Sequence, residues 1–85
     1  MGNLRDVAGA GRLEMDEAGQ VVFADYRLAG DQLIIDHVEA PTALRGTGAA
    51  GRFMQLLLEH AAANGQSIVP ICGYAAAWLR RHARL

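Results

Sequence analysis

A cluster of glycines directly before a long amphipathic stretch is the feature that most restricts the fold. Gly46, Gly48 and Gly51 lie within six residues, and the stretch after them ends at Asn64-Gly65. Glycine costs helix stability unless the backbone itself has a task there. The first turn of a helix presents unpaired amide protons and the positive end of the dipole, which bare glycines leave open to a phosphate. We therefore expect a phosphate-binding helix start, with glycines that merely permit close packing as the alternative.

The segments around this cluster predict a single α+β domain, in an α/β arrangement. Alternating or β-branched runs with connections of about four residues favour hairpins; the expected strands are Arg12–Asp16, Val21–Leu28 and Leu33–Ala40. After the loop at Pro41, the expected elements are a helix from Gly48 to Asn64-Gly65, a buried strand Ser67–Cys72 and a helix Tyr74–Arg81. Pro70 favours an edge or a bulge for the fourth strand. The order is an antiparallel three-strand meander, then helix, strand and helix (β-β-β-α-β-α), with residues 1–8 expected to be frayed.

One face of the long helix is expected to be largely apolar, because its side chains recur at helical spacing. These side chains are Phe53, Leu56, Leu57, His60, Ala61 and Asn64. We interpret His60 as a core histidine with a satisfied ring rather than as a ligand.

Size and composition exclude several classes of function. The chain has 85 residues, a net charge of −1, one cysteine, three histidines and eight basic residues that are all arginine. The absence of lysine excludes the P-loop and Schiff-base chemistry, and a lone cysteine excludes an internal disulfide. We expect no metal site, no nucleic-acid partner because positive charge is not in excess, and no membrane partner because Arg52, Gln55 and Glu59 interrupt the most apolar stretch. A reducing, cytoplasmic location fits best.

Two motifs compete for the glycine cluster. Gly46-x-Gly48-x-x-Gly51 satisfies the dinucleotide fingerprint GxGxxG. That fingerprint follows a parallel strand through a tight turn and needs an acidic residue about twenty positions later. Here about five residues separate Ala40 from Gly46, and the strand that follows the helix carries no acidic side chain. A nicotinamide or flavin enzyme is therefore disfavoured.

The other motif resembles the acetyl-CoA loop of GNAT-superfamily N-acetyltransferases, [QR]-x-x-G-x-[GA], which Arg45-x-x-Gly48-x-Ala50 fits fully. The segments 37–46, 69–74 and 78–82 are also similar to short single-domain GNAT-like proteins, so the resemblance covers about residues 12–82. It implies a minimal GNAT-like domain over residues 1–85 that uses acetyl-CoA as co-substrate. In that fold acyl-CoA inserts where two strands of the sheet splay apart. The backbone near Glu39 and Ala40 would then bind pantetheine.

The resemblance also implies which loop residues bind the rest of the cofactor. Backbone amides from Gly46 to Gly51 would hold the pyrophosphate, and Arg45 would add positive charge, although a surface arginine is an equal interpretation. The residues concerned are Arg45, Gly46, Thr47, Gly48, Ala49, Ala50 and Gly51.

Four side chains are candidates for the chemistry. Cys72 would lie near the thioester, either as an acyl acceptor or as pocket wall, since thiolates attack thioesters readily; its alternative is a small buried hydrophobe. Tyr74 is a candidate general acid for the departing CoA thiolate. His37 and Glu39 lie two residues apart on one strand face and could deprotonate an amine directly or through water. The alternative for Tyr74 is packing of its ring. The alternative for His37 and Glu39 is a strand face that is merely solvated.

The expected function is therefore transfer of acetyl from acetyl-CoA to a small-molecule amine or a protein amino group. The alternative is a CoA-binding or protein-interaction module that does not turn over, and a third possibility is an adaptor without a CoA site. Ordinary GNAT enzymes carry additional amino-terminal helices that shape the acceptor site. A partner protein, or a second copy in a homodimer, would then complete this site.

Overall fold

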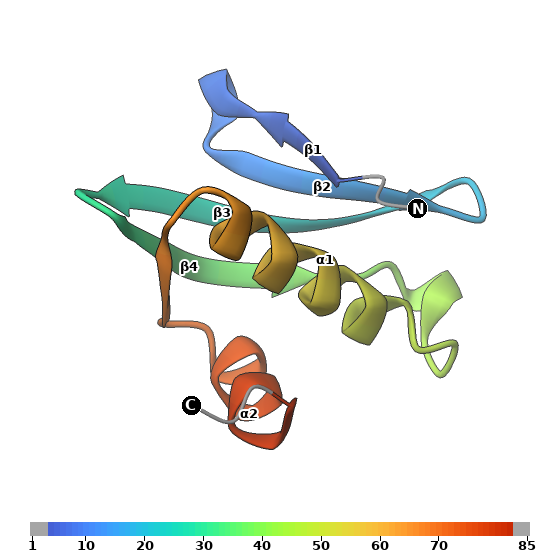
Figure 1. The fold of residues 1–85 in the computed structure, drawn as a ribbon. Coiled ribbons are helices and arrows are strands. Elements are labelled where there is room, and N and C mark those ends of the chain that lie inside the picture. The colour runs from blue at the N-terminus through green and yellow to red at the C-terminus, as the bar shows by residue number, and fades with distance from the viewer. Residues whose placement is uncertain (1–3, 83–85) are drawn as a thin grey trace.

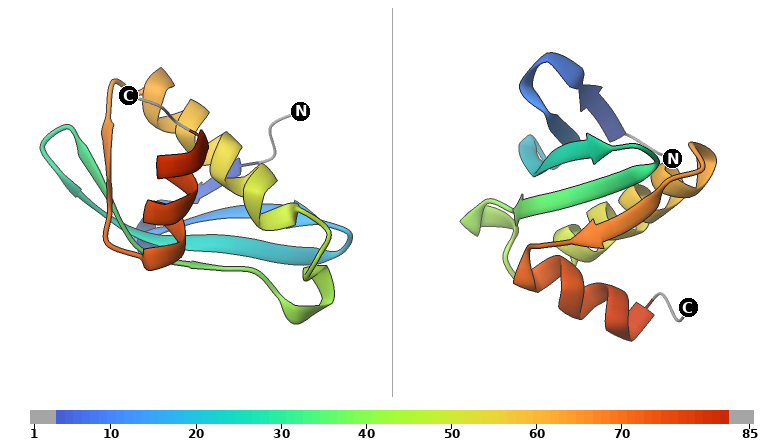
Figure 2. Two further views of the ribbon diagram at one scale, coloured as in Figure 1. Left: turned by 90° about the horizontal axis from the view of Figure 1, so that it is seen from below. Right: turned by 90° about the vertical axis from the view of Figure 1, so that its left-hand side faces the viewer.

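The fold is a five-stranded sheet with two helices packed on one of its faces (Figures 1 and 2). The computed structural model describes residues 4–82. The elements are β1 Leu4–Val7, β2 Arg12–Glu17, β3 Gln20–Ala29, β4 Gln32–Glu39, α1 Ala49–Ala63, β5 Ser67–Pro70 and α2 Gly73–His82, with 3₁₀ turns at Ala8–Ala10 and Thr42–Leu44. In the described part of the chain, neither helix has the length and apolarity to span a membrane.

The strands lie side by side in chain order, from β1 at one edge to β5 at the other. Neighbours from β1 to β4 are antiparallel, which confirms the expected meander and extends it by one strand. β5 runs parallel to β4, and α1 is the crossover between them. As expected from Pro70, which has no amide proton, β5 is an edge strand.

Strand β1 corrects the expectation that residues 1–8 are frayed. Leu4–Val7 pairs in register with β2, while residues 1–3 lie outside the described part. Its sequence shows no apolar alternation, because an exposed aspartate lies on the side of the sheet that faces the core: Asp6 pairs with Leu13 and accepts a hydrogen bond of 2.7 Å from the Tyr26 hydroxyl. A four-residue strand with a carboxylate on its core face therefore escapes a search for hydrophobic period two.

The core lies between the sheet and the two helices. Its fully buried larger side chains come from β2, β3, β4 and α1: Leu13, Val22, Leu33, Ile35, Phe53, Met54 and Leu57. Trp78 and Ala75 of α2 complete the cluster. The apolar face expected for α1 is correct at Phe53, Leu57 and Ala61. It is wrong at Asn64, which is exposed, and at His60, which is half-buried rather than a core residue.

The opposite face of the sheet carries cross-strand charge pairs, and no helix of residues 4–82 covers it. The pairs are Arg5 with Glu14 and Asp16, Arg12 with Asp25, and Arg27 with Asp36. The Arg12 guanidinium also lies 3.9 Å from the centre of the Phe23 ring. Exposed pairs of this kind contribute little each to stability, but they make the face compatible with water. We call it the open face below.

A bulge in β4 changes which side chains face the core. Asp25 pairs with His37, whereas the next residue, Tyr26, pairs with Ile35, so Asp36 is the extra residue. With Ile35 buried and Val38 packed on the core, His37 points to the open face instead of toward α1. An extra residue also bends the strand that carries it.

The strands β4 and β5 separate at this bulge. Their parallel pairing covers Gln32 to Ile35 and ends where Ile35 faces Pro70. The Ile35 carbonyl oxygen then accepts the amides of both Ile71 and Cys72, at 2.9 and 3.1 Å. From Asp36 onward, β4 has no strand partner on its β5 side within the described residues. The sheet is thus splayed, as the family resemblance implied.

Candidate active site

The glycine loop joins β4 to α1 through two left-handed residues. Gly46 has φ 79° and Gly48 has φ 83°. Residues other than glycine rarely adopt these backbone angles. Gly48 is the N-cap of α1 and, being glycine, offers no side chain to cap the helix. The two glycines are therefore required first by the backbone conformation, and openness to a ligand comes in addition.

Some amides of the loop are already occupied within the chain. The Thr47 amide donates to the Leu44 carbonyl oxygen at 3.1 Å. The Thr47 hydroxyl donates to the same carbonyl at 2.6 Å and accepts the Ala49 amide at 3.2 Å. The regular helical bonding of α1 begins with the Arg52 amide, which donates to the Gly48 carbonyl. Among the amides of residues 46–51, those of Gly46, Gly48, Ala50 and Gly51 have no acceptor within residues 4–82.

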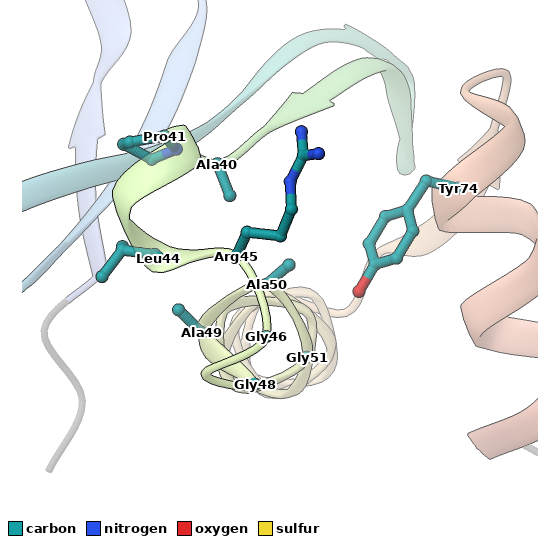
Figure 3. A pocket seen from close by; sticks show the side chains of 10 residues that line it. All are labelled: Ala40, Pro41, Leu44, Arg45, Gly46, Gly48, Ala49, Ala50, Gly51 and Tyr74. Atoms are coloured by element: carbon teal, nitrogen blue, oxygen red, sulfur yellow. The ribbon is translucent and has the colours of Figure 1, made fainter.

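A pocket of about 340 Å³ opens onto this helix start (Figure 3). It lies between the end of β4, the loop, the first turn of α1 and the first turn of α2. Its lining consists of Ala40, Pro41, Leu44, Arg45, Gly46, Gly48, Ala49, Ala50, Gly51 and Tyr74. The structure thus brings together Tyr74, Ala40 and nearly all the expected loop residues.

Arg45 and Tyr74 extend into the pocket from different elements, the loop and α2 (Figure 3). The Arg45 guanidinium is exposed and has no ion-pair partner among the described residues. Burial raises the pKa of the Tyr74 phenol above its ordinary value; Arg81 opposes this shift, and an ionised Cys72 thiol would add to it. The phenol is therefore a proton donor at neutral pH, and Cys72 lies close enough to influence it.

Arg52 is a charged neighbour of the loop that the sequence analysis did not single out. Its guanidinium makes a bidentate pair with Glu17, with Nε 3.0 Å from Oε1. The same guanidinium lies beside Gly48, where a Cβ would be 3.1 Å from Nη1. The two residues are 35 positions apart in the sequence, so the spacing of hydrophobic residues could not predict that they pair. A second cation thus stands at the helix start.

His37 and Glu39 lie together but outside this pocket. His37 Nε2 is 2.9 Å from Glu39 Oε1, and both side chains are more than half exposed. The expectation that they share one strand face is therefore confirmed. Their face is the open face, on the other side of the sheet from α1 and the glycine loop, whereas the backbone that follows Glu39 reaches the pocket at Ala40.

Cys72 lies where β5 ends and α2 begins. Its amide is held by Ile35 as described above, and its half-buried side chain packs against the core. It is not among the residues that line the 340 Å³ pocket, although Tyr74 two residues later is. The thiol is therefore adjacent to the splay between β4 and β5 and not at the glycine loop.

The open mixed sheet, whose strands β4 and β5 separate beside a glycine-rich helix start, defines the class of protein: an α+β domain with a pocket at its glycine loop. The family model described as GCN5-related N-acetyl-transferase matches residues 12–85, so the chain belongs to this family. The resemblance drawn from Arg45, Gly48 and Ala50 is thereby confirmed. Membership supports a general acetyltransferase activity. A comparison with curated proteins finds no match to this chain.

Proposed function

We propose that this protein transfers acetyl from acetyl-CoA to an amine, with the CoA pyrophosphate bound at the glycine loop. The observation that carries the proposal is the group of unpaired amides at the start of α1. Gly46, Gly48, Ala50 and Gly51 all line one pocket, and no acceptor within residues 4–82 pairs with their amides. Backbone donors at a helix start attract phosphate because the helix dipole adds to their partial charges.

The residues present suit a bound CoA. A Cβ at Gly46 would meet nothing within 4 Å, so the loop is open on that side. The exposed Arg45 guanidinium in the pocket wall can pair with phosphate. Pantetheine would then extend along the unpartnered edge of β4 near Glu39 and Ala40, toward the splay and Cys72.

When bound, acetyl-CoA supplies an activated acetyl group as a thioester. Transfer forms a bond from the amine nitrogen to the acetyl carbonyl carbon and breaks the bond from that carbon to sulfur. Tyr74 donates its hydroxyl proton to the departing thiolate; burial raises its pKa, so the phenol is protonated at neutral pH. The Glu39–His37 pair takes the amine proton, directly or through water. Solvent restores the proton that Tyr74 loses and takes up the proton that the Glu39–His37 pair gained, so the residues return to their starting state.

The amine would arrive from the open face. The Glu39 carboxylate is exposed there, and its partner is a histidine rather than an arginine, so it can attract a cationic acceptor. We propose a small-molecule amine or a protein amino group as the acceptor. Because no helix of residues 4–82 covers this face, a partner or a second copy of the chain would complete the acceptor site.

Cys72 gives the reaction a second route, in which the thiol first accepts the acetyl group. Its position next to the splay supports this alternative, and its absence from the pocket lining favours direct transfer. Intact-mass measurement after mixing the protein with acetyl-CoA separates the two routes. An adduct of one acetyl group that is lost in Cys72→Ala supports the covalent route, and its absence under acid quench supports direct transfer.

Calorimetric titration with acetyl-CoA tests the proposed function. Binding, together with thermal stabilisation by CoA but not by NAD or adenosine, is the expected result. Release of free CoA thiol in the presence of a panel of amines then distinguishes the enzyme from a module that binds CoA without turnover. An acetyl-CoA titration without heat or stabilisation would overturn both, and would leave Gly46 and Gly48 with a conformational role alone.

A further inference from the structure

A second pocket lies at the end of α1 that is remote from the glycine loop, where the last turns of α1, the start of β5 and α2 meet (Figure 2). Its volume is about 280 Å³. The lining is mainly apolar and includes Leu58, Ala61, Ala62, Ile68 and Leu79. A helix of 15 residues is about 22 Å long, and the two pockets share no lining residue. This pocket is therefore separate from the one proposed for acetyl-CoA.

The way in which α1 ends fixes Gln66 at this pocket. Gly65 is left-handed, with φ 65°, and its amide donates to the Ala62 carbonyl oxygen at 3.2 Å. The Gln66 amide donates to the Ala61 carbonyl oxygen at 2.8 Å. These two bonds define a Schellman motif, in which the position of Gln66 frequently carries an apolar side chain that packs on the last turns of the helix. Here the position carries a polar amide, and Gln66 lines the pocket.

The side-chain oxygen of Gln66 is buried without a hydrogen-bond partner. Within residues 4–82, Oε1 is the single buried side-chain oxygen or nitrogen of this kind. Such an atom is costly, because it has given up its bonds to water without replacing them. The nitrogen of the same amide makes no hydrogen bond to the described residues either. Rotation of the amide about its last side-chain bond therefore breaks no hydrogen bond, and it lets Oε1 accept from a group in the pocket.

The charge distribution at this pocket favours a neutral donor. The carbonyl oxygens of the last helical turn form the negative end of the α1 dipole, which attracts N–H and O–H groups. None of the residues that line the pocket is charged, so an ion would have no countercharge there. The chemistry that fits is an apolar body with one hydrogen-bond donor.

We infer that this pocket binds a small neutral molecule with an apolar ring and one hydroxyl or N–H group, which donates to Gln66 Oε1. An apolar cavity of roughly 150 Å³ is enough to hold benzene. The volume of about 280 Å³ therefore suits a substituted ring. The ring would pack against Leu58, Ile68 and Leu79, and the donor would satisfy the unpaired oxygen. The inference goes beyond the proposed function and does not depend on it.

The first experiment is a methyl-detected NMR titration of the full-length chain with p-cresol and p-xylene. The two probes have nearly the same shape, and p-xylene carries a methyl group in place of the hydroxyl. We expect millimolar p-cresol to shift the methyl resonances of Leu58, Ile68 and Leu79. Those of Leu13 and Leu44, which do not line the pocket, should stay in place. Stationary resonances of the three lining residues would overturn the inference. Because acetyl-CoA is absent from this titration, its outcome is independent of the proposed function.

The second experiment removes the acceptor with Gln66→Met, which keeps the length of the side chain. We expect the affinity for p-cresol relative to that for p-xylene to fall about 3- to 10-fold, as for the loss of one net hydrogen bond. An unchanged ratio would overturn the inference. The urea midpoint of the free Gln66→Met protein should rise, because the substitution removes an unpaired buried oxygen. A lower midpoint would show that Oε1 has a partner and would contradict the inference.

The third experiment fills the pocket with Ala62→Leu, and Ala63→Leu is the matched control. Both alanines are exposed on α1, but only Ala62 lines the pocket. We expect Ala62→Leu to abolish the p-cresol shifts and Ala63→Leu to retain them. Equal binding by the two variants would overturn the inference. Sedimentation equilibrium tests a second copy of the chain as the occupant: self-association that Ala62→Leu abolishes would assign the pocket to an interface and overturn the inference as well.

Discussion

Gly48 and Gly51 lie three residues apart in one loop, yet glycine is needed there for different physical reasons. Gly48 has φ 83° and caps α1, so an L side chain at this position is strained. A left-handed conformation costs other residues roughly 1–2 kcal/mol. Gly51 lies inside α1, and its Cβ would make an ordinary contact of 3.5 Å with Trp78. Its replacement removes the entropic cost of glycine in a helix.

We expect Gly48→Ala to lower the free energy of unfolding by roughly 1–2 kcal/mol. Gly51→Ala is the matched control and should raise it by roughly 0.5–1 kcal/mol. Urea unfolding at neutral pH, followed by circular dichroism, measures both. The close contact of a Gly48 Cβ with Arg52 adds little, because the guanidinium is the end of a flexible side chain. Equal effects of the two substitutions would contradict this assignment of roles.

Tyr74 should determine the alkaline limit of the reaction. A general acid must be protonated, and burial raises the pKa of this phenol, so turnover should fall only as pH rises beyond the ordinary tyrosine range. We expect Tyr74→Phe to reduce kcat by about 10²- to 10⁴-fold and to leave acetyl-CoA affinity within a few-fold. The measurement is the pH profile of CoA release with an active amine. If the Tyr74→Phe protein retains full kcat, the Tyr74 ring has a packing role and is not the general acid.

Single residues were predictable where the chemistry is local. The pairing of His37 with Glu39 followed from a spacing of two in a strand, and the loop motif identified Arg45 and Gly48. The sequence did not indicate that the Thr47 amide donates to Leu44 and the Ala49 amide to the Thr47 hydroxyl, which leaves four of the six expected backbone donors for a ligand. Such competition inside a loop depends on its three-dimensional path, which residue types alone do not determine.

At the scale of elements, the bulge at Asp36 has two consequences. It turns His37 to the open face, and it lies at the position where β4 and β5 separate. Strand boundaries were predictable from hydrophobic alternation. The bulge was not, because it is a property of the register between β3 and β4 and leaves no mark in either strand alone. Strand β1 was missed for the same reason, because it is defined by its pairing with β2 and not by a hydrophobic pattern of its own.

We expect deletion of Asp36 to straighten β4 and to impair the ligand site without unfolding the protein. The deletion keeps Ile35 and Val38 on the core side while it removes the extra residue. Acetyl-CoA should then bind about tenfold more weakly or worse, a difference of roughly 1.4 kcal/mol or more. Asp36→Asn is the control: it disrupts the charge pair with Arg27 but keeps the bulge, and should bind nearly normally. Calorimetry measures the acetyl-CoA affinity of both variants. Normal binding by the folded deletion protein would show that the bulge is not needed for ligand binding.

At the scale of the whole molecule, exposed ion pairs determine how stability depends on acid. Hydrogen bonds from arginines hold three carboxyl pKa values below the ordinary 3.8 of aspartate and 4.5 of glutamate: those of Asp16, Glu17 and Asp36. A carboxylate with a lowered pKa stabilises the fold while it is ionised. This stabilisation is complete above the ordinary values and is lost as pH falls through the lower values of the folded state.

Stability at alkaline pH depends on the hydroxyl of Tyr26, whose pKa is shifted upward rather than downward. The Tyr26 hydroxyl donates to Asp6, and this bond, with burial, raises the pKa of Tyr26 from 10.0 to about 12. A group with a raised pKa stabilises the fold while it is protonated, so this contribution is present below pH 10.0 and disappears as pH rises from 10.0 to about 12. The bond ties β1 to β3, and its loss should therefore release β1 from the core before the rest of the sheet.

We expect the urea midpoint to be highest between about pH 5 and 10, and to fall toward pH 3 and pH 12. High salt should weaken the exposed pairs and flatten the acidic limb, because their charges are screened. Tyr26→Phe should lower the midpoint at neutral pH and reduce the fall between pH 10.0 and about 12, while it leaves the acidic limb unchanged. Since β1 holds an aspartate on its core face, hydrogen exchange of the β1 amides should rise in this variant ahead of those in β3. An unchanged alkaline limb in Tyr26→Phe would show that the bond to Asp6 does not couple β1 to the sheet.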